Sequence, residues 1–320
     1  MPDTNARLTY FRRSVRASFF LVLFLVLIGG VVRSTGAGMG CPDWPRCFGS
    51  WIPPTSAEQV PAEYWTNPLS SKDGSLVFNP VKTWTEYLNR LLGVLIGFAI
   101  LIQFGFSFFS RLAARARIFS ALSFVLVVFQ GWLGSVVVST DLRPVIITLH
   151  LLVALLIALS LLLSLFFSQL RHESAFGLSH SNLVWWVSGI LLIQFFLGTE
   201  VRSQVDVLFK QFAYENRFAY ADALNWKFLF HRSFSVLALF LMGYQIFHLG
   251  RHLAAAQVRY VFYPFLLGLS LVLSGIILIY FGFPALVQPL HLLFGFAIVC
   301  SQCWLLLLLR FAHPTRNAIG

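Results

Sequence analysis

Three histidines occupy places where an ionisable side chain is costly. His150, His231 and His291 each lie near one end of a long apolar segment, at matching depths. Imidazole is a common axial ligand of haem iron, and two imidazoles on facing helices can fill both axial positions. We therefore expect His231 and His291 to be the iron ligands of an electron-transfer haem. The alternative is a pair of core histidines that hydrogen-bond to each other.

A polar cluster opens another apolar segment. Glu86, Asn89 and Arg90 fall within five residues and share one face of a helix. Asparagine is no useful haem ligand, so a porphyrin held by His150 beside Asn89 would keep one iron face open, as a reaction site requires. Glu86 is a candidate catalytic carboxylate. Thr83 and Glu86 also fit a helix-capping box, and the residues support both interpretations equally.

Two arginines accompany these candidates. Arg90 lies four residues after Glu86, and Arg232 directly follows His231. Either arginine could bind a porphyrin carboxylate, and Arg90 could instead pair with Glu86. Both could also be anchors at a membrane surface.

The four cysteines form two pairs. Cys41 and Cys47 lie in a long polar segment, which an oxidising compartment would allow to carry a disulfide. We expect that disulfide; two free thiols, or half of a metal site, are the alternatives. Cys300 and Cys303 lie among leucines, so we expect them to be small packing residues despite their redox-like spacing.

Composition then shows what must position these residues. Of 320 residues, 58% are hydrophobic and 11% are charged, and the mean hydropathy is +0.78. A soluble core could not hide so much apolar surface, so the chain is predicted to be an integral membrane protein. Eight apolar stretches are long enough, or nearly so, to cross a bilayer as helices: about 17–32, 84–109, 118–139, 145–170, 183–200, 228–249, 259–282 and 285–310.

Charge sets the expected orientation. The net charge is +11, but the basic residues lie between apolar stretches rather than in a basic domain, which argues against nucleic-acid binding. Arginines gather at alternate connections, so both termini are predicted to be cytoplasmic. No cleavage site follows the first stretch, which we therefore interpret as a helix rather than a signal peptide. These features suit a bacterial inner membrane.

The apolar stretches form an internal repeat. Asn89 pairs with His231, Gly134 with Gly275 and His150 with His291, each at an offset of 141 or 142 residues. Gly29-Gly-Val-Val-Arg33 resembles Gly198-Thr-Glu-Val-Arg202 at an offset of 169, because the second outer loop, about 201–227, is shorter than the first. We predict an all-α integral membrane protein of eight transmembrane helices, built as two parallel pseudo-symmetric four-helix bundles. The halves are residues 1–170, with a long outer loop at 33–83, and residues 183–310.

Several motifs resemble the haem A synthase family. They are GGVVRSTGAGMGCPDWPRC after the first helix, EYLNRLLG in the second, HRSFSVLALF in the sixth and PLHLLFGFAIV in the eighth, together with a histidine in the fourth helix. The resemblance spans all eight helices and is most specific in the first motif.

The resemblance implies an oxidoreductase that converts the C8 methyl of haem O to a formyl group in two successive hydroxylations, for cytochrome oxidase. It implies a haem b cofactor on His231 and His291 in the second half, toward the outer face. His150 would be the substrate-side iron ligand, Glu86 the carboxylate near the reacting methyl, and Cys41 and Cys47 a disulfide. The family often has histidine where this chain has Asn89.

Two other function classes remain. A bis-histidine membrane cytochrome b, moving electrons between quinol and an outer acceptor, explains His231 and His291 but not Glu86 or Asn89. A haem chaperone or transporter fits two haem-binding halves without turnover. The synthase interpretation implies haem O delivered by a haem O synthase, an unidentified electron donor and the lipid bilayer as partners. The sequence leaves a homo-oligomer open.

Overall fold

The chain is almost entirely helical where its structure is described. The computed structural model describes residues 4–65, 78–169, 173–174, 181–211, 223–251, 253, 255–311 and 313–314. Within these ranges, eight helices are long and apolar enough to cross a membrane. The predicted all-α membrane fold with eight spanning helices is therefore confirmed.

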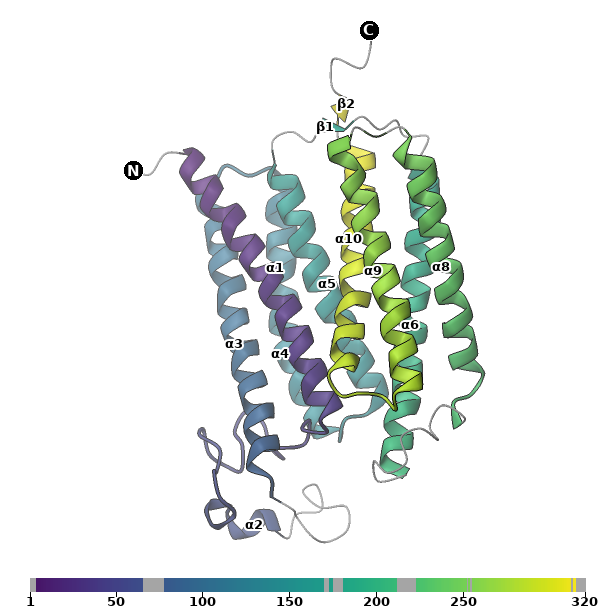
Figure 1. Cartoon of the computed structure of the whole chain (residues 1–320). Coiled ribbons are helices and arrows are strands. Elements are labelled where there is room, and N and C mark those ends of the chain that lie inside the picture. The colour runs from purple at the N-terminus through teal and green to yellow at the C-terminus, as the bar shows by residue number, and fades with distance from the viewer. Residues whose placement is uncertain are drawn as a thin grey trace. The chain divides into compact units, whose positions relative to one another are not determined.

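The chain divides into two compact units, and the first comprises Met1–Ser168. Its four long helices pack in a closed ring in which each contacts two neighbours, in the order α1, α3, α4, α5 (Figure 1). Their bounds are α1 Thr4–Ser34, α3 Pro80–Phe109, α4 Ala114–Ser139 and α5 Pro144–Ser168. The connection from α1 to α3 carries the 3-10 helix η1 (Ala57–Gln59) and the short helix α2 (Ala62–Trp65).

The second unit, Gln169–Gly320, repeats this order of neighbours. Its ring runs α6, α8, α9, α10. The helices are α6 Ser181–Gln211, α8 Trp226–Gly250, α9 Ala255–Tyr280 and α10 Val287–Phe311. The two-residue strands β1 (Glu173–Ser174) and β2 (His313–Pro314) pair in parallel. In both units, the helices that carry the candidate ligands are therefore opposite members of a ring, α3 with α5 and α8 with α10.

Local sequence fixes where the ligand-bearing helices begin. At α3, the Asn79 side chain accepts a hydrogen bond from the Lys82 amide at 3.1 Å, and Pro80 occupies the first turn. At α8, the Asn225 side chain accepts from the Lys227 amide at 2.9 Å. These caps satisfy backbone donors at the start of the helices that carry Glu86 and His231.

Two helices extend well beyond the apolar stretches that predicted them, by more than two turns at one end. The predicted span 17–32 lies within α1, which begins at Thr4, and α6 continues past residue 200 to Gln211. The predicted second outer loop, 201–227, is therefore helical at its start, while residues 212–222 lie outside the described ranges. Hydropathy marks the part of a helix that is apolar enough to lie in lipid. The backbone hydrogen bonds of the helix can continue beyond that edge, into polar sequence.

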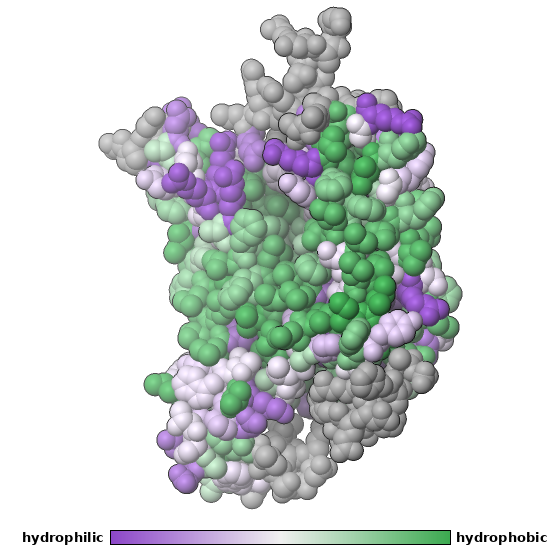
Figure 2. Space-filling model, viewed as in Figure 1, coloured by the Kyte–Doolittle hydropathy of each residue, from purple (hydrophilic) through white to green (hydrophobic). Residues whose placement is uncertain are grey.

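The surface agrees with a membrane setting. Figure 2 shows hydrophobic side chains over the middle of the helices and hydrophilic ones toward their ends. Large apolar side chains such as Phe98, Val236 and Phe240 are more than half exposed. In water such a surface would aggregate, but in a bilayer it contacts lipid tails.

Candidate functional site

The predicted haem ligands of the second unit face each other across its ring of helices. The ring centres of His231 on α8 and His291 on α10 are 6.4 Å apart, with the ring planes at 69°. Imidazole binds a metal ion at about 2.0–2.1 Å, as measured for zinc, so two such bonds plus the offset of each nitrogen from its ring centre span about 6 Å. The spacing therefore fits one iron between the two imidazoles.

Glycines on the other two helices make room for these rings. A Cβ added at Gly198 of α6 would lie 3.1 Å from Cε1 of His231, and one at Gly275 of α9 would lie 3.4 Å from Cε1 of His291. A larger residue at Gly198 would therefore press on the His231 imidazole, and a Cβ at Gly275 would already be in van der Waals contact with His291. The four helices each contribute one residue, two histidines and two glycines, to a single cradle.

Polar contacts hold the two histidines differently. The Gln194 side-chain amide donates to the His231 backbone carbonyl at 2.8 Å, while Nδ1 of His231 is buried without a hydrogen-bond partner in the described structure. Nδ1 of His291, in contrast, lies 2.8 Å from the Ser274 hydroxyl. A histidine that ligates a metal commonly uses its second nitrogen in such a contact.

The first unit repeats the cradle with one change. A Cβ added at Gly134 of α4 would lie 3.5 Å from Cε1 of His150, and one at Gly29 of α1 would lie 3.9 Å from Oδ1 of Asn89. Asn89 thus occupies the place that His231 has in the second unit. Gln130 donates to the His150 carbonyl at 3.0 Å. Oδ1 of Asn89 and Nδ1 of His150 are both buried and lack partners among the described residues, so this unit keeps unused polar atoms where a ligand would meet them.

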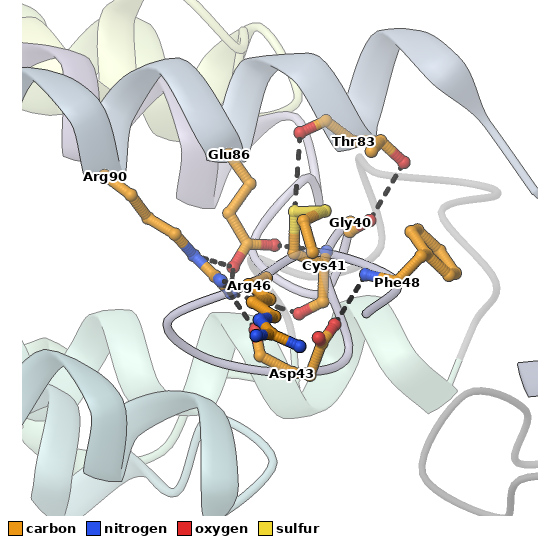
Figure 3. Close-up of polar contacts among 9 residues, drawn as sticks. Gly40, Cys41, Asp43, Arg46, Phe48, Thr83, Glu86 and Arg90 are labelled. Carbon is orange, nitrogen blue, oxygen red and sulfur yellow. Dashed lines mark hydrogen bonds and ion pairs between the residues drawn. A yellow bond between two sulfur atoms is a disulfide. The ribbon is translucent and has the colours of Figure 1, made fainter. Parts of the chain in front are cut away.

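Glu86 fastens a disulfide loop, defined here as residues 40–49, onto α3 (Figure 3). Its Oε2 accepts from the Cys41 backbone amide at 2.9 Å, and its Oε1 accepts from Nε of Arg90 at 3.1 Å and forms an ion pair with that guanidinium. Cys41 and Cys47 form the predicted disulfide, and both are fully buried. Glu86 itself is only 4% exposed, so its carboxylate belongs to the interior of the first unit.

Arg90 completes the fastening with donors aimed at loop carbonyls. Its guanidinium donates to the carbonyls of Asp43 at 2.6 Å, Cys41 at 3.1 Å and Arg46 at 3.2 Å. Arginine can do this because it offers five N–H donors in a fixed fork. Of the roles predicted for Arg90, the pairing with Glu86 is the one that the structure shows.

The loop also approaches α3 through its backbone. Thr83 donates its hydroxyl hydrogen to the Gly40 carbonyl at 2.9 Å. A Cβ at Gly40 would lie 2.5 Å from the Lys82 carbonyl oxygen, closer than any side chain tolerates, so only glycine fits. Within the loop, the Asp43 carboxylate accepts from the amides of Phe48 at 2.6 Å and Gly49 at 2.9 Å.

The capping-box interpretation of Thr83 and Glu86 is wrong. The N-cap of α3 is Asn79, so Thr83 lies inside the first turns and its hydroxyl contacts the loop instead. The mistake has a physical cause, because the apolar run starts one turn after the helix does. The sequence pattern marked the first apolar residue rather than the first helical one.

Arg232 differs from its counterpart Arg90. The register places Phe228 where the first unit has Glu86, and the Arg232 guanidinium lies over the Phe228 ring at 5.9 Å. No carboxylate in the described part of the chain pairs with Arg232. Its charge is therefore available to an anionic ligand of the second unit.

Sequence reasoning missed four residues that shape these sites: Gly40, Gln130, Gln194 and Ser274. Gly40 is the last of three alternating glycines, Gly36, Gly38 and Gly40, for which the sequence predicted no contact. Ser274 directly precedes a repeat glycine, Gly275, so comparison of the repeats position by position was the signal that could have found it. The two glutamines lie one turn before Gly134 and Gly198 and could have been found in the same way.

Comparison with known proteins places these geometries in context. A family model described as cytochrome oxidase assembly protein matches residues 12–303. A haem A synthase of Shewanella oneidensis is 30% identical over 139 residues, which are 43% of this chain and 39% of that protein. A haem A synthase of Ehrlichia canis is 28% identical over 229 residues, 67% of this chain and 66% of that protein. One from Methylobacterium nodulans is 34% identical over 132 residues, 39% of this chain and 36% of that protein. The matched part of this chain thus spans less than two thirds of each relative's length.

Proposed function

This chain belongs to the haem A synthase family of cytochrome oxidase assembly proteins, and from that premise we propose that it oxidises the C8 methyl group of haem O to a formyl group in two successive hydroxylations. The observation that carries the proposal is the contrast at one repeated position. His231 opposes His291 in the second unit, whereas Asn89 takes the place of that ligand in the first. One cradle therefore suits a permanently ligated cofactor and the other a substrate.

The second unit is proposed to hold haem b. His231 and His291 would be its axial ligands, Gly198 and Gly275 would leave room for the imidazoles, and Arg232 would bind a propionate. When bound, haem b supplies one-electron transfer to the reaction. The residues of this unit would keep both iron faces filled, which suits electron transfer and disfavours oxygen binding.

The first unit is proposed to hold the substrate haem O. His150 would be its one iron ligand, and Asn89 would leave the opposite face accessible. Glu86 would act on the methyl carbon, either by stabilising positive charge that develops there or by accepting a proton from water or a hydroxylated intermediate. Arg90 and the Cys41 amide would hold that carboxylate in one orientation, as their contacts with it support.

Co-expression with a haem O synthase tests the reaction. Extracted haems are separated by chromatography and identified by mass. Haem A, or a hydroxylated haem O, supports the synthase. Only haem b and unchanged haem O would reject it and leave the bis-histidine cytochrome or the haem chaperone.

A second experiment separates a catalytic Glu86 from one that only fastens the loop. Glu86→Gln keeps an oxygen that can accept from Cys41 but removes the negative charge. The matched variant Thr83→Val loses the neighbouring contact with Gly40 and keeps the carboxylate. A catalytic role predicts that Glu86→Gln loses product while Thr83→Val retains most of it. The reverse pattern would show that loop docking, and not the carboxylate, is what the reaction needs.

The proposal includes a setting for the enzyme. We place it in a bacterial inner membrane with both termini in the cytoplasm and both haem sites toward the outer face, supported by the arginine distribution and the eight apolar helices. Haem O would arrive from a haem O synthase, and an unidentified donor would reduce haem b. Reporter fusions at the two termini test the orientation, and an outer location of either terminus would overturn it.

A further inference from the structure

The imidazole of His291 has a partner that fixes its protonation. Ser274 lies on α9, beside the glycine that makes room for this ring. Its hydroxyl bonds the Leu271 carbonyl at 3.0 Å and lies 2.8 Å from Nδ1 of His291. A carbonyl oxygen can only accept, and a hydroxyl has one hydrogen, so the hydroxyl donates to Leu271 and accepts from Nδ1–H. The hydrogen on Nδ1 leaves the lone pair on Nε2, the nitrogen that a metal would use.

The matching histidine of the first unit has no such partner. Nδ1 of His150 is buried and unpaired among the described residues. The repeat offset of 141 residues places Leu133 where the second unit has Ser274, and Leu133 is a buried residue of α4 with 4% exposure. A leucine side chain can neither donate nor accept, so it cannot fix the ring.

We propose that Ser274 is a positioning residue that locks His291 as a permanent axial ligand, and that Leu133 leaves His150 free to release its ligand. The inference rests on the proposed function, because it assigns a resident haem to one unit and a porphyrin that must leave to the other. Hydrogen bonding to the second nitrogen holds a ligating imidazole in place and raises its basicity. This serine-for-leucine difference thus adds to the contrast of His231 with Asn89 between a retained cofactor and an exchangeable substrate.

The second unit provides the main experiment. Ser274→Ala removes the hydroxyl that accepts from Nδ1–H, and Ser274→Thr restores a hydroxyl. Ser270→Ala is the matched control, because it deletes another α9 hydroxyl, whose partner among the described residues is the Leu266 carbonyl at 2.9 Å. The readouts are the midpoint potential of the haem b signal and the rate at which haem b passes to apomyoglobin.

A weaker imidazole stabilises ferric iron less, so Ser274→Ala should shift the midpoint potential upward and speed haem loss. A tenfold change in the ferric-to-ferrous affinity ratio corresponds to about 59 mV. Ser274→Thr should return both readouts toward the wild-type values, and Ser270→Ala should leave them there. If Ser274→Ala matches Ser270→Ala in both readouts, the inference is wrong.

The first unit gives the converse test. Leu133→Ser puts a hydroxyl at the position that matches Ser274 in the repeat, and Leu133→Ala creates similar space without one. The probe is haem O itself, loaded into the protein and followed as it transfers to apomyoglobin. Release should be several-fold slower from Leu133→Ser than from Leu133→Ala, and equal rates would overturn the inference for this unit.

Failure of the inference can be told from failure of the proposed function. A wild-type protein that shows low-spin haem b but makes no haem A rejects the synthase activity, while the potential of Ser274→Ala still decides the role of Ser274. A wild-type protein without a bis-histidine signal rejects both.

Discussion

Gly198→Ala should damage the haem b site through a single methyl group. The added Cβ would lie 3.1 Å from Cε1 of His231, so the ring must move by a few tenths of an ångström. That ring is proposed to be one of two opposed ligands, and a tilt would lengthen its bond to iron. The helix itself favours the change, since alanine is better than glycine in a helix interior by about 0.5–1 kcal/mol.

The steric cost should outweigh this gain at the site. Overpacking by a methyl group in a filled core costs about 1–3 kcal/mol, which corresponds to about 5-fold to 150-fold in binding. Gly189→Ala is the control, because a Cβ there, on the same helix, meets nothing within 4 Å. It should keep haem b and gain the helix contribution alone.

The assay measures the haem b content per protein and the low-spin absorption spectrum of the purified variants. Thermal unfolding of the wild type and both variants is compared in one detergent. Gly198→Ala should lose haem b or show a shifted spectrum, and Gly189→Ala should match the wild type or unfold at a higher temperature. If Gly198→Ala binds haem b fully, with an unchanged spectrum, then Gly198 does not shape the ligand site.

Three further predictions concern the disulfide loop and Tyr64 of α2, whose hydroxyl lies 3.5 Å from the Asp43 carboxylate of that loop. Gly40→Ala should undock it, because the Cβ would lie 2.5 Å from the Lys82 carbonyl oxygen; faster proteolysis of residues 40–49 would show this, and wild-type resistance would contradict it. Arg90→Lys should weaken docking by the same assay, since an ammonium has three donors for the four groups that Arg90 serves, whereas Arg232→Lys should leave the loop intact. Burial, with a smaller contribution from Asp43, raises the pKa of Tyr64 above its ordinary 10.0. The folded protein therefore holds the Tyr64 proton more tightly than the unfolded chain, and the resulting stabilisation, complete below pH 10.0, is lost as the pH rises through the raised pKa. The difference in phenolate absorbance between the wild type and Tyr64→Phe should show one late-ionising tyrosine, and an ordinary titration would refute this.

The membrane fold and the paired histidines could be predicted because both depend on regular spacing. Hydropathy located all eight spans, and the repeat placed His231 and His291 at one depth before any contact was known. Equal depth on opposite helices of a ring is a condition for contact, and the 6.4 Å separation of the two imidazoles shows that both side chains also face the interior.

The contacts of Glu86 and Ser274 could not be predicted in this way. Glu86 fastens a loop whose nearest contact, Cys41, lies 45 residues earlier, and no period links an irregular loop to a helix face. Ser274 is one of several serines in apolar helices, most of which bond their own backbone. Which of them also meets a histidine depends on helix rotation, and a few tens of degrees decide it.

Asn89 has a consequence for how the two halves can evolve. An asparagine codon and a histidine codon differ at one base, so a single mutation can interconvert the residues opposite the shared histidine. Gly29 faces Asn89 as Gly198 faces His231, so the helix beside the asparagine already carries the small residue that accompanies the larger ring in the second unit. A duplicated chain of this kind can thus gain or lose a matched pair of ligands in one genetic step, and relatives with either residue at this position are neighbours in sequence space.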